Sequence, residues 1–224
     1  MEVDDHVVIV GASHAAVQLM ISIRQQGWLG AITVISDELH MPYQRPPLSK
    51  AYLDGSVEEG RLALRAPEMY EKLDVVFKLG HTVVAIDAGT NQVTLDTGEQ
   101  IGFTKLALCT GARVRQLDLP GAELGGVHYL RTMDDVKAIR HSAKKASRAV
   151  IIGGGYIGLE TAASLTKLGI KVTVLETESR LLKRVASEQV SEFYKHLHEE
   201  EGVEIRLGSK VVALQGDGHV KRVI

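Results

Sequence analysis

The stretch VVIVGASHAA (residues 7–16) runs from four apolar residues into a turn of small residues, and a helical pattern follows it. A second stretch, AVIIGGGYIG (residues 149–158), repeats this layout 142 residues later. After each stretch, a helix-ending glycine (Gly27 or Gly169) precedes another β-branched run. A buried strand, a glycine turn, an amphipathic helix and a further buried strand are typical of a parallel β-α-β unit. The chain is therefore predicted to contain two such units.

The residues between and after these units complete a two-domain α/β fold. Residues 82–109 alternate in short segments broken by turns, which predicts an antiparallel meander and then one buried strand. A link rich in glycine and proline follows, then a basic helix over residues 134–145. After the second unit we expect a helix over residues 187–200, a strand over 203–207 and a hairpin over 210–224 that stops in mid-course.

These elements predict two Rossmann-like, three-layer dinucleotide-binding units in a glutathione-reductase-like arrangement. Each carries an antiparallel meander, and the second meander is incomplete. We place the first domain at residues 1–112 and the second at residues 113–224.

Composition narrows the classes of function. The 224 residues are 45% hydrophobic and 24% charged, which is typical of a globular protein, and a net charge of -2 gives no general attraction to nucleic acid or to an anionic membrane. The acidic start lacks a secretion signal, and no run is apolar enough to cross a membrane. The single cysteine, Cys109, excludes an internal disulfide, a redox-active cysteine pair and a metal site built on paired cysteines. We expect a cytoplasmic protein with no metal site.

The second glycine loop meets every requirement of a pyrophosphate site. Gly153 makes the turn, Gly155 permits close approach of phosphate, and Gly158 permits close packing of helix and strand. Glu176 stands 23 residues after Gly153 at the end of the next strand, where its carboxylate can accept both ribose hydroxyls and repel the extra phosphate of NADP. NADH is the expected nucleotide, and the alternative is a glycine-rich turn without a ligand.

The first glycine loop departs from the pattern. Ser13 replaces the second glycine and Ala16 the third. The Ser13 hydroxyl can bond a phosphate oxygen or cap the helix. Asp37 is the candidate ribose ligand with Glu38 as a competitor, although either acid can be a solvated loop residue. Two nucleotide sites in one chain suit hydride transfer between two cofactors, and a flavin is the natural recipient.

A further motif, PYQRPPLSKAYL (residues 42–53), resembles the flavin-binding segment of the ferredoxin reductase family, whose members are FAD-dependent and oxidise NADH. ALCTGA (residues 107–112), YLRT (residues 129–132) and GGGYIGLE (residues 153–160) resemble the same family. Its members, which include putidaredoxin and rubredoxin reductases, pass electrons from NADH through FAD to an iron–sulfur protein. The resemblance implies the same activity and cofactors here, with a ferredoxin or rubredoxin as partner and a monomer or homodimer as the assembly.

The resemblance also implies site residues. For FAD they are Gly11, Ser13, His14, Ala15, Ala16, Asp37, Arg45, Pro46, Lys50, Val83, Thr110, Gly111 and Arg131. For NAD they are Gly153, Gly155, Tyr156, Ile157, Gly158 and Glu176.

Lys50 and Glu160 are the expected catalytic pair. Pro46 and Pro47 restrict the backbone before Lys50, and a cation beside the flavin would stabilise the reduced ring. The resemblance makes Glu160, which we place in the first turn of its helix, the carboxylate partner of Lys50. The alternative is an unpaired Glu160 that is stabilised by the helix dipole.

Two other functions remain open at this point. The family's later Gly-Asp flavin motif and C-terminal domain have no counterpart in these 224 residues, so the chain can be a truncated, non-catalytic dinucleotide-binding module. It can also be an NADH oxidase related to apoptosis-inducing factor. The basic residues Lys137, Arg140, Lys144, Lys145 and Arg148 can dock an acidic ferredoxin or form a solvated helix face.

Overall fold

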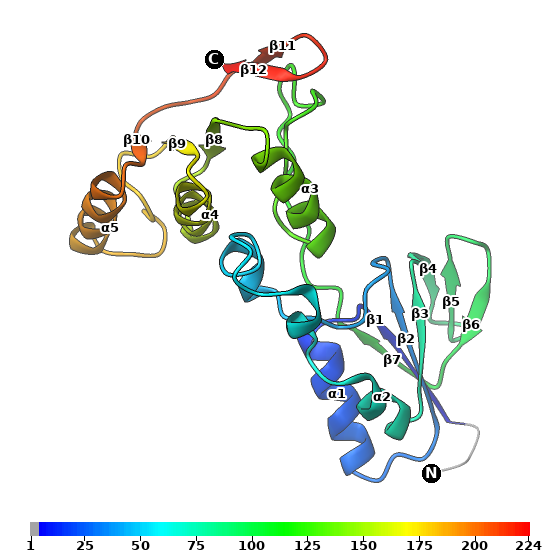
Figure 1. Ribbon diagram of the computed structural model, residues 1–224. Helices are drawn as coiled ribbons and strands as arrows, with labels where there is room; N and C mark the ends of the chain where they lie inside the picture. Colours follow the sequence, from blue (N-terminus) through cyan, green and yellow to red (C-terminus); the bar gives the residue numbers. More distant parts are fainter. Residues whose placement is uncertain (1–4) are drawn as a thin grey trace. The chain divides into compact units, whose positions relative to one another are not determined.

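The computed structural model describes residues 5–224 and divides them into two compact units (Figure 1). The first unit contains residues 5–44 and Gly60–Ala112. The second unit contains Arg45–Glu59 and Arg113–Ile224. The chain therefore enters the second unit briefly, returns to the first, and enters the second again.

The first unit is built on a four-stranded parallel sheet in the order β3-β2-β1-β7. Its strands are β1 (His6–Val10), β2 (Ala31–Ser36), β3 (Val75–Leu79) and β7 (Lys105–Leu108), and its helices are α1 (His14–Gln25) and α2 (Pro67–Lys72). Strand β3 and helix α2 were not predicted from the sequence. The first three residues of β3, the apolar run Val75-Val76-Phe77, could have indicated this strand.

The two faces of this sheet are covered by different layers. Val7 and Ile9 point to the side of α1 and pack in one core cluster with buried residues of that helix, such as Met20. Val8 points to the other side and packs with Val93 of an antiparallel meander. Alternate residues of β1 are thus buried on opposite faces, as the period of a strand requires. The meander consists of β4 (Val83–Asp87), β5 (Gln92–Leu95) and β6 (Gln100–Gly102). The predicted three-layer unit is confirmed here.

The second unit holds a three-stranded parallel sheet in the order β10-β9-β8 and a separate antiparallel hairpin. Its strands are β8 (Arg148–Ile152), β9 (Lys171–Leu175), β10 (Glu204–Arg206), β11 (Leu214–Gly216) and β12 (Val220–Val223). Its helices are α3 (Met133–Ala143), α4 (Tyr156–Lys167) and α5 (Glu188–Glu200). The predicted α/β fold with a parallel sheet and antiparallel strands is confirmed.

Helix ends follow local chemistry. Thr132 and Asp135 form a capping box at the start of α3, and Ser187 caps α5. Gly27 and Gly169 adopt positive φ angles of 83° and 80° just after α1 and α4, as expected for glycines that end helices.

The segment 45–59, which the sequence analysis placed in the first domain, packs within the second unit. Its short helix η1 (Pro46–Ser49) contacts α3 and α4. The Tyr52 side chain is 2% exposed and lies under the guanidinium of Arg140, and Glu59 pairs with Lys137 at 3.0 Å. These contacts explain why the segment leaves the unit to which its neighbours in sequence belong. A further short helix, η2 (Glu59–Leu62), follows it.

Among the helices of residues 5–224, none is both long enough and apolar enough to pass through a bilayer.

Candidate functional site

The second glycine loop joins β8 to α4 and has the conformation that its sequence predicts. Gly153 has φ 114°, and its N–H donates to the carbonyl of Leu175 at 2.8 Å. No atom lies within 4 Å of the position that a Cβ would occupy at Gly153 or at Gly155. The loop backbone is therefore open to a ligand at the positive end of the helix dipole, where phosphate binds well.

Gly158 has a different role in the same loop. A Cβ at this position would lie 2.1 Å from the carbonyl oxygen of Gly153 and 3.4 Å from the side chain of Ile151. Only glycine therefore lets α4 approach the end of β8 this closely. Tyr156 and Ile157, the two other predicted contacts, are 50% and 52% exposed at the start of α4.

Glu176 supports the loop directly. One carboxylate oxygen accepts the N–H of Gly154 at 2.7 Å, and the other accepts the N–H of Glu178 at 2.8 Å. Both bonds fix the carboxylate directly after β9, beside the glycine loop. Glu176 was predicted at the strand end, but its bond to the loop was not predicted.

The first glycine loop joins β1 to α1 and is similar in outline. Gly11 has φ 103°, and its N–H donates to the carbonyl of Ile35 at 2.7 Å. A Cβ at Gly11 would lie 2.2 Å from the carbonyl oxygen of Cys109, so this glycine is required by the approach of the neighbouring chain. Ser13 precedes α1 and makes no side-chain capping bond, so of its two predicted uses the helix cap is not adopted.

The two units differ after the second strand of each. The N–H of Gly11 donates to Ile35, and the N–H of Gly153 donates to Leu175. Ser36, which follows Ile35, is therefore the equivalent of Glu176, which follows Leu175. The Ser36 hydroxyl accepts the N–H of Glu38, just as Glu176 accepts the N–H of Glu178. Asp37, the predicted ribose ligand, is the next residue and is exposed. The connection from Gly27 to β2 is two residues longer than the connection from Gly169 to β9. Counting residues from each glycine loop therefore does not identify Ser36 as the equivalent of Glu176.

The other predicted residues of the first unit lie at strand and helix ends. Val83 is the first residue of β4, and His14 and Ala15 are exposed in the first turn of α1. Thr110 and Gly111 follow β7, and the Cα of Thr110 lies 3.1 Å from the Cβ position of Gly11. The structure thus brings the first glycine loop and the turn after β7 together.

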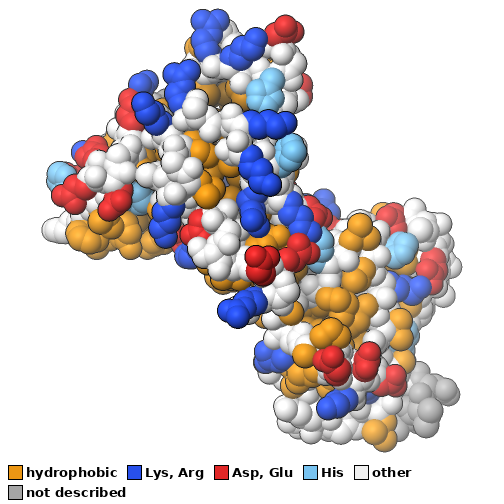
Figure 2. Space-filling view, viewed as in Figure 1, with side chains coloured by type: hydrophobic (Ala, Val, Ile, Leu, Met, Phe, Trp, Pro, Cys, Tyr) orange, Lys and Arg blue, Asp and Glu red, His pale blue; other side chains and the backbone are white. Residues whose placement is uncertain are grey.

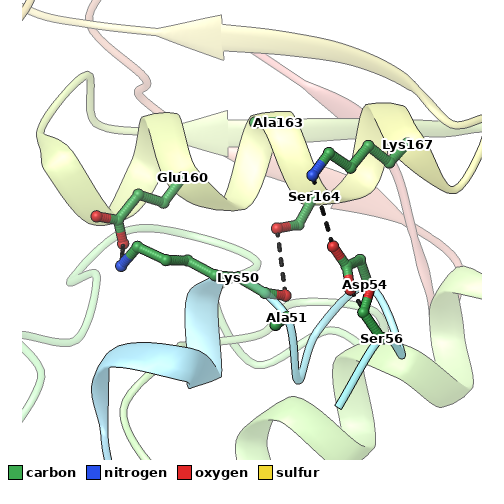
Figure 3. Close-up of a pocket in the computed structure, with 8 residues that line it drawn as sticks. All are labelled: Lys50, Ala51, Asp54, Ser56, Glu160, Ala163, Ser164 and Lys167. Carbon is green, nitrogen blue, oxygen red and sulfur yellow. Dashed lines mark hydrogen bonds and ion pairs between the residues drawn. The ribbon is translucent and has the colours of Figure 1, made fainter.

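Lys50 and Glu160 form an ion pair, with Nζ and Oε2 2.8 Å apart (Figure 3). Glu160 is the fifth residue of α4, so its predicted place in the first turn of the helix was wrong by one position. Glu160 is thus paired with Lys50, and the alternative of an unpaired carboxylate does not hold in the structure. Both side chains are partly exposed, at 49% for Lys50 and 31% for Glu160.

A pocket of about 410 Å³ lies between the segment 50–56 and α4. Figure 3 shows the Lys50–Glu160 pair at one end of the helix and Lys167 beside Asp54 at the other, with Ser164 between them. The hydrogen bond from Ser56 is the main cause that lowers the pKa of Asp54, and Lys167 adds to it. Ser164 and the neighbouring Ser49 are residues that the sequence analysis missed.

Arg45 and Arg131, both predicted to bind FAD, are joined in the second unit. The Arg45 guanidinium donates to the carbonyl of Arg131 at 2.8 Å, and the N–H of Arg131 donates to Asp135 at 2.9 Å. Pro46 begins the short helix η1 beside them.

Cys109 and the basic cluster are the remaining side chains with a chemistry of their own. Cys109 packs against the core of the first unit, and burial raises the pKa of its thiol, so it is a packed small side chain and not an activated nucleophile. Lys137 and Arg140 of the basic cluster already contact Glu59 and Tyr52. Figure 2 shows Lys and Arg side chains gathered over the part of the second unit that carries α3. In residues 5–224, no three His, Cys, Asp or Glu side chains are grouped so as to hold a metal ion.

Comparisons with known proteins agree with this arrangement. The chain is 43% identical over 218 residues to a ferredoxin–NAD(P)(+) reductase of Sphingomonas sp, covering 97% of this chain and 53% of the relative. It is 41% identical to putidaredoxin reductase of Pseudomonas putida, covering 96% and 52%. The rubredoxin–NAD(+) reductase of the same organism is 38% identical, with 97% and 57% covered. The chain thus spans about half the length of these curated relatives.

Solved structures give the same result. Putidaredoxin reductase in its covalent complex with putidaredoxin matches with a TM-score of 0.93 and 39% identity, over 100% of this chain and 55% of that one. A ferredoxin reductase of Rhodopseudomonas palustris matches with a TM-score of 0.92 and 36% identity, over 98% and 54%. The profile of the family described as pyridine nucleotide-disulphide oxidoreductase matches residues 5–224. With both glycine loops inside that match, the chain belongs to the pyridine nucleotide-disulphide oxidoreductase family.

Proposed function

We propose that this chain is the nucleotide-binding part of a cytoplasmic flavoprotein that passes electrons from NADH through FAD to a ferredoxin or rubredoxin. The observation that carries the proposal is the duplication of the glycine-loop unit in one chain, because two dinucleotide sites allow one coenzyme to reduce the other. The names of the relatives, which are reductases of ferredoxin, putidaredoxin and rubredoxin, support the choice of acceptor. The single cysteine supports a cytoplasmic location, and these 224 residues supply no cysteine pair for disulfide chemistry.

NADH is assigned to the second unit. The open backbone at Gly153 and Gly155 fits a pyrophosphate, because a side chain in either place would fill the space that the phosphate needs. Glu176, held by Gly154 and Glu178, presents a fixed carboxylate to the ribose. Such a carboxylate favours NADH over NADPH by charge repulsion.

FAD is assigned to the first glycine loop together with the residues that the resemblance indicates. The Ser13 hydroxyl, which caps no helix, fits a phosphate oxygen, and Asp37 is the ribose ligand on this proposal. The resemblance assigns Arg45, Pro46, Lys50 and Arg131 to FAD as well.

The flavin, when bound, supplies the step between a two-electron hydride donor and a one-electron acceptor. The protein contributes position and charge. Lys50 is the cation that would stabilise negative charge on the reduced ring, and Glu160 keeps that cation in place through the 2.8 Å ion pair. No acid or base of the chain is required for hydride transfer, because correct positioning supplies most of the rate.

The visible spectrum of the purified chain, after incubation with FAD and gel filtration, tests the proposal. A retained yellow flavin that bleaches on addition of NADH supports it, and electron transfer to an added ferredoxin that exceeds transfer to oxygen supports the assigned acceptor. A colourless chain that still binds NADH would establish a non-catalytic module instead. Bleaching with transfer to oxygen alone would establish an oxidase.

A further inference from the structure

One carboxylate oxygen of Glu160 makes both an ion pair and a hydrogen bond. This atom, Oε2, lies 2.8 Å from Nζ of Lys50 and 2.5 Å from the hydroxyl oxygen of Ser49. Ser49 and Lys50 are consecutive residues at the end of η1, so both donors reach the carboxylate from the same turn of the chain. The ion pair is therefore part of a three-residue contact.

Ser49 is buried, whereas the side chain of Lys50 is partly exposed. Ser49 is 5% exposed, whereas the side chain of Lys50 is 49% exposed. An exposed ion pair contributes little and allows several side-chain positions. A hydrogen bond from a buried hydroxyl to a carboxylate is stronger and more directional. Ser49 is thus better placed than Lys50 to fix the position of the Glu160 carboxylate.

Ser164 holds Ser49 from the same helix. It lies one turn after Glu160 on α4, is 4% exposed, and donates its hydroxyl to the carbonyl of Ser49 at 2.8 Å. Ser49 therefore donates to one residue of α4 and accepts from another. These two bonds fix both the side chain and the backbone of Ser49 against the helix.

We propose that Ser49 and Ser164 are positioning residues for Lys50. Ser164 fixes the backbone of Ser49, Ser49 fixes the carboxylate of Glu160, and the carboxylate fixes the ammonium that is to face the flavin. The Lys50 ammonium also donates to the carbonyl of Pro46, the first residue of η1, at 3.2 Å. This inference rests on the proposed function, because it assigns Lys50 a place beside a flavin.

A purely structural role, in which the two serines only fasten the segment 45–59 to α4, is the alternative to be tested. Ser49→Ala removes the donor to Glu160, and Ser49→Thr keeps a hydroxyl and should restore the behaviour of the native chain. Ser164→Ala tests the second bond if Ser49→Ala folds poorly. Ser56→Ala is the matched control, since Ser56 lines the same pocket and bonds to Asp54 instead of Glu160.

The first measurement needs no cofactor. The NMR signal of the Lys50 ammonium should shift toward that of a free lysine in Ser49→Ala and Ser164→Ala, and stay in place in Ser56→Ala. A double-mutant cycle of Ser49→Ala with Glu160→Gln should show a coupling of roughly tenfold in the unfolding equilibrium constant. An unchanged ammonium signal in both serine variants would overturn the proposal, even if their stability falls.

The second measurement uses the FAD-loaded chain. Lys50→Ala should make the flavin harder to reduce, and Ser49→Ala should shift the midpoint potential in the same direction by a smaller amount. Ser49→Thr and Ser56→Ala should leave the potential at its native value. If Lys50→Ala shifts the potential and Ser49→Ala does not, positioning by Ser49 is wrong while the proposed function stands. If the native chain retains no FAD, the proposed function fails, and the ammonium signal still decides whether the serines position Lys50.

Discussion

The two parallel sheets carry the same kind of central strand but differ in what covers it. Val8 of β1 and Val150 of β8 occupy equivalent places, on the sheet face away from the glycine-loop helix. Val8 is fully buried under the meander of the first unit, whereas Val150 is 44% exposed. Ile152, two residues on, is 39% exposed. Burying one valine side chain stabilises a fold by roughly 1.5–3 kcal/mol, so the two units differ in how firmly their sheets are held.

The antiparallel strands of the second unit explain this difference. In the first unit β4, β5 and β6 cover the sheet, and β7 pairs with β1. In the second unit the hairpin of β11 and β12 pairs with the link before α3, through bonds from Leu214 to Pro120 and from Val220 to Gly125, both at 2.8 Å. Within residues 5–224, β8 is an edge strand. An apolar run therefore shows that a strand can be buried on two faces, and the neighbouring elements decide whether it is.

The helix–strand contact gives the largest expected difference between the units. Gly158→Ala places a Cβ 2.1 Å from the backbone oxygen of Gly153, which cannot move freely, and we expect the second unit to lose about 1–3 kcal/mol and most of its affinity for NADH. Ala16, the equivalent residue of the first unit, already carries a Cβ, so Ala16→Gly is the control, with a loss of roughly 0.5–1 kcal/mol. Denaturant unfolding and NADH titration check both variants. If Gly158→Ala keeps native stability and native NADH affinity, the helix–strand contact at Gly158 tolerates a Cβ just as the contact at Ala16 does.

The sheet faces give the next largest difference. Val8→Thr keeps the shape of the side chain and buries a hydroxyl, which should destabilise the first unit by roughly 1–3 kcal/mol. Val150→Thr should change the second unit by less than about 0.5 kcal/mol, because water reaches the new hydroxyl. Hydrogen exchange of the amides in each sheet measures the two effects separately. Equal effects would mean that the face carrying Val150 is covered in solution.

The two units also differ in the residue at the end of the second strand, which is Glu176 in the second unit and Ser36 in the first. Glu176→Ala removes a carboxylate that supports Gly154 and repels the extra phosphate of NADPH, so the preference for NADH over NADPH should fall about tenfold. Ser36→Ala, at the equivalent place of the first unit, should leave that preference unchanged. The ratio of the two dissociation constants is the measurement. An unchanged ratio in Glu176→Ala would contradict the assignment of NADH to this carboxylate.

The smallest expected effect concerns acid stability. His198 of α5 is 7% exposed, and burial lowers its pKa below the ordinary 6.5. The unfolded chain therefore takes up the proton first, so this residue costs no stability above pH 6.5 and destabilises the second unit as the pH falls below it. His198→Gln should flatten that decline, and the exposed His196→Gln should not. Unfolding curves between pH 7 and pH 5 make the comparison, and parallel declines in His198→Gln and the native chain would rule out the effect.

Much of the site was predictable because it depends on contacts close in sequence. In each unit the glycine loop follows directly on its strand, and in the second unit Glu176 stands only 23 residues after Gly153, so these conformations follow from glycine's freedom and the helix dipole. The family resemblance added the Lys50–Glu160 pair. Ser36 was missed because the connection after α1 is two residues longer, and Ser49 and Ser164 were missed because 115 residues separate them. Strand β3 was missed as well, since its five residues contain only a short apolar run.

The sequence by itself determined two β-loop-α units, their glycine turns and the meander of the first, because strand and helix periods and positive φ angles are local properties. Only the tertiary structure decided which unit holds the segment 45–59, which residue stands in register with Glu176, and which sheet face is covered. Those outcomes depend on contacts between residues far apart in the chain. Side-chain packing selects among such contacts, and no local pattern encodes that choice.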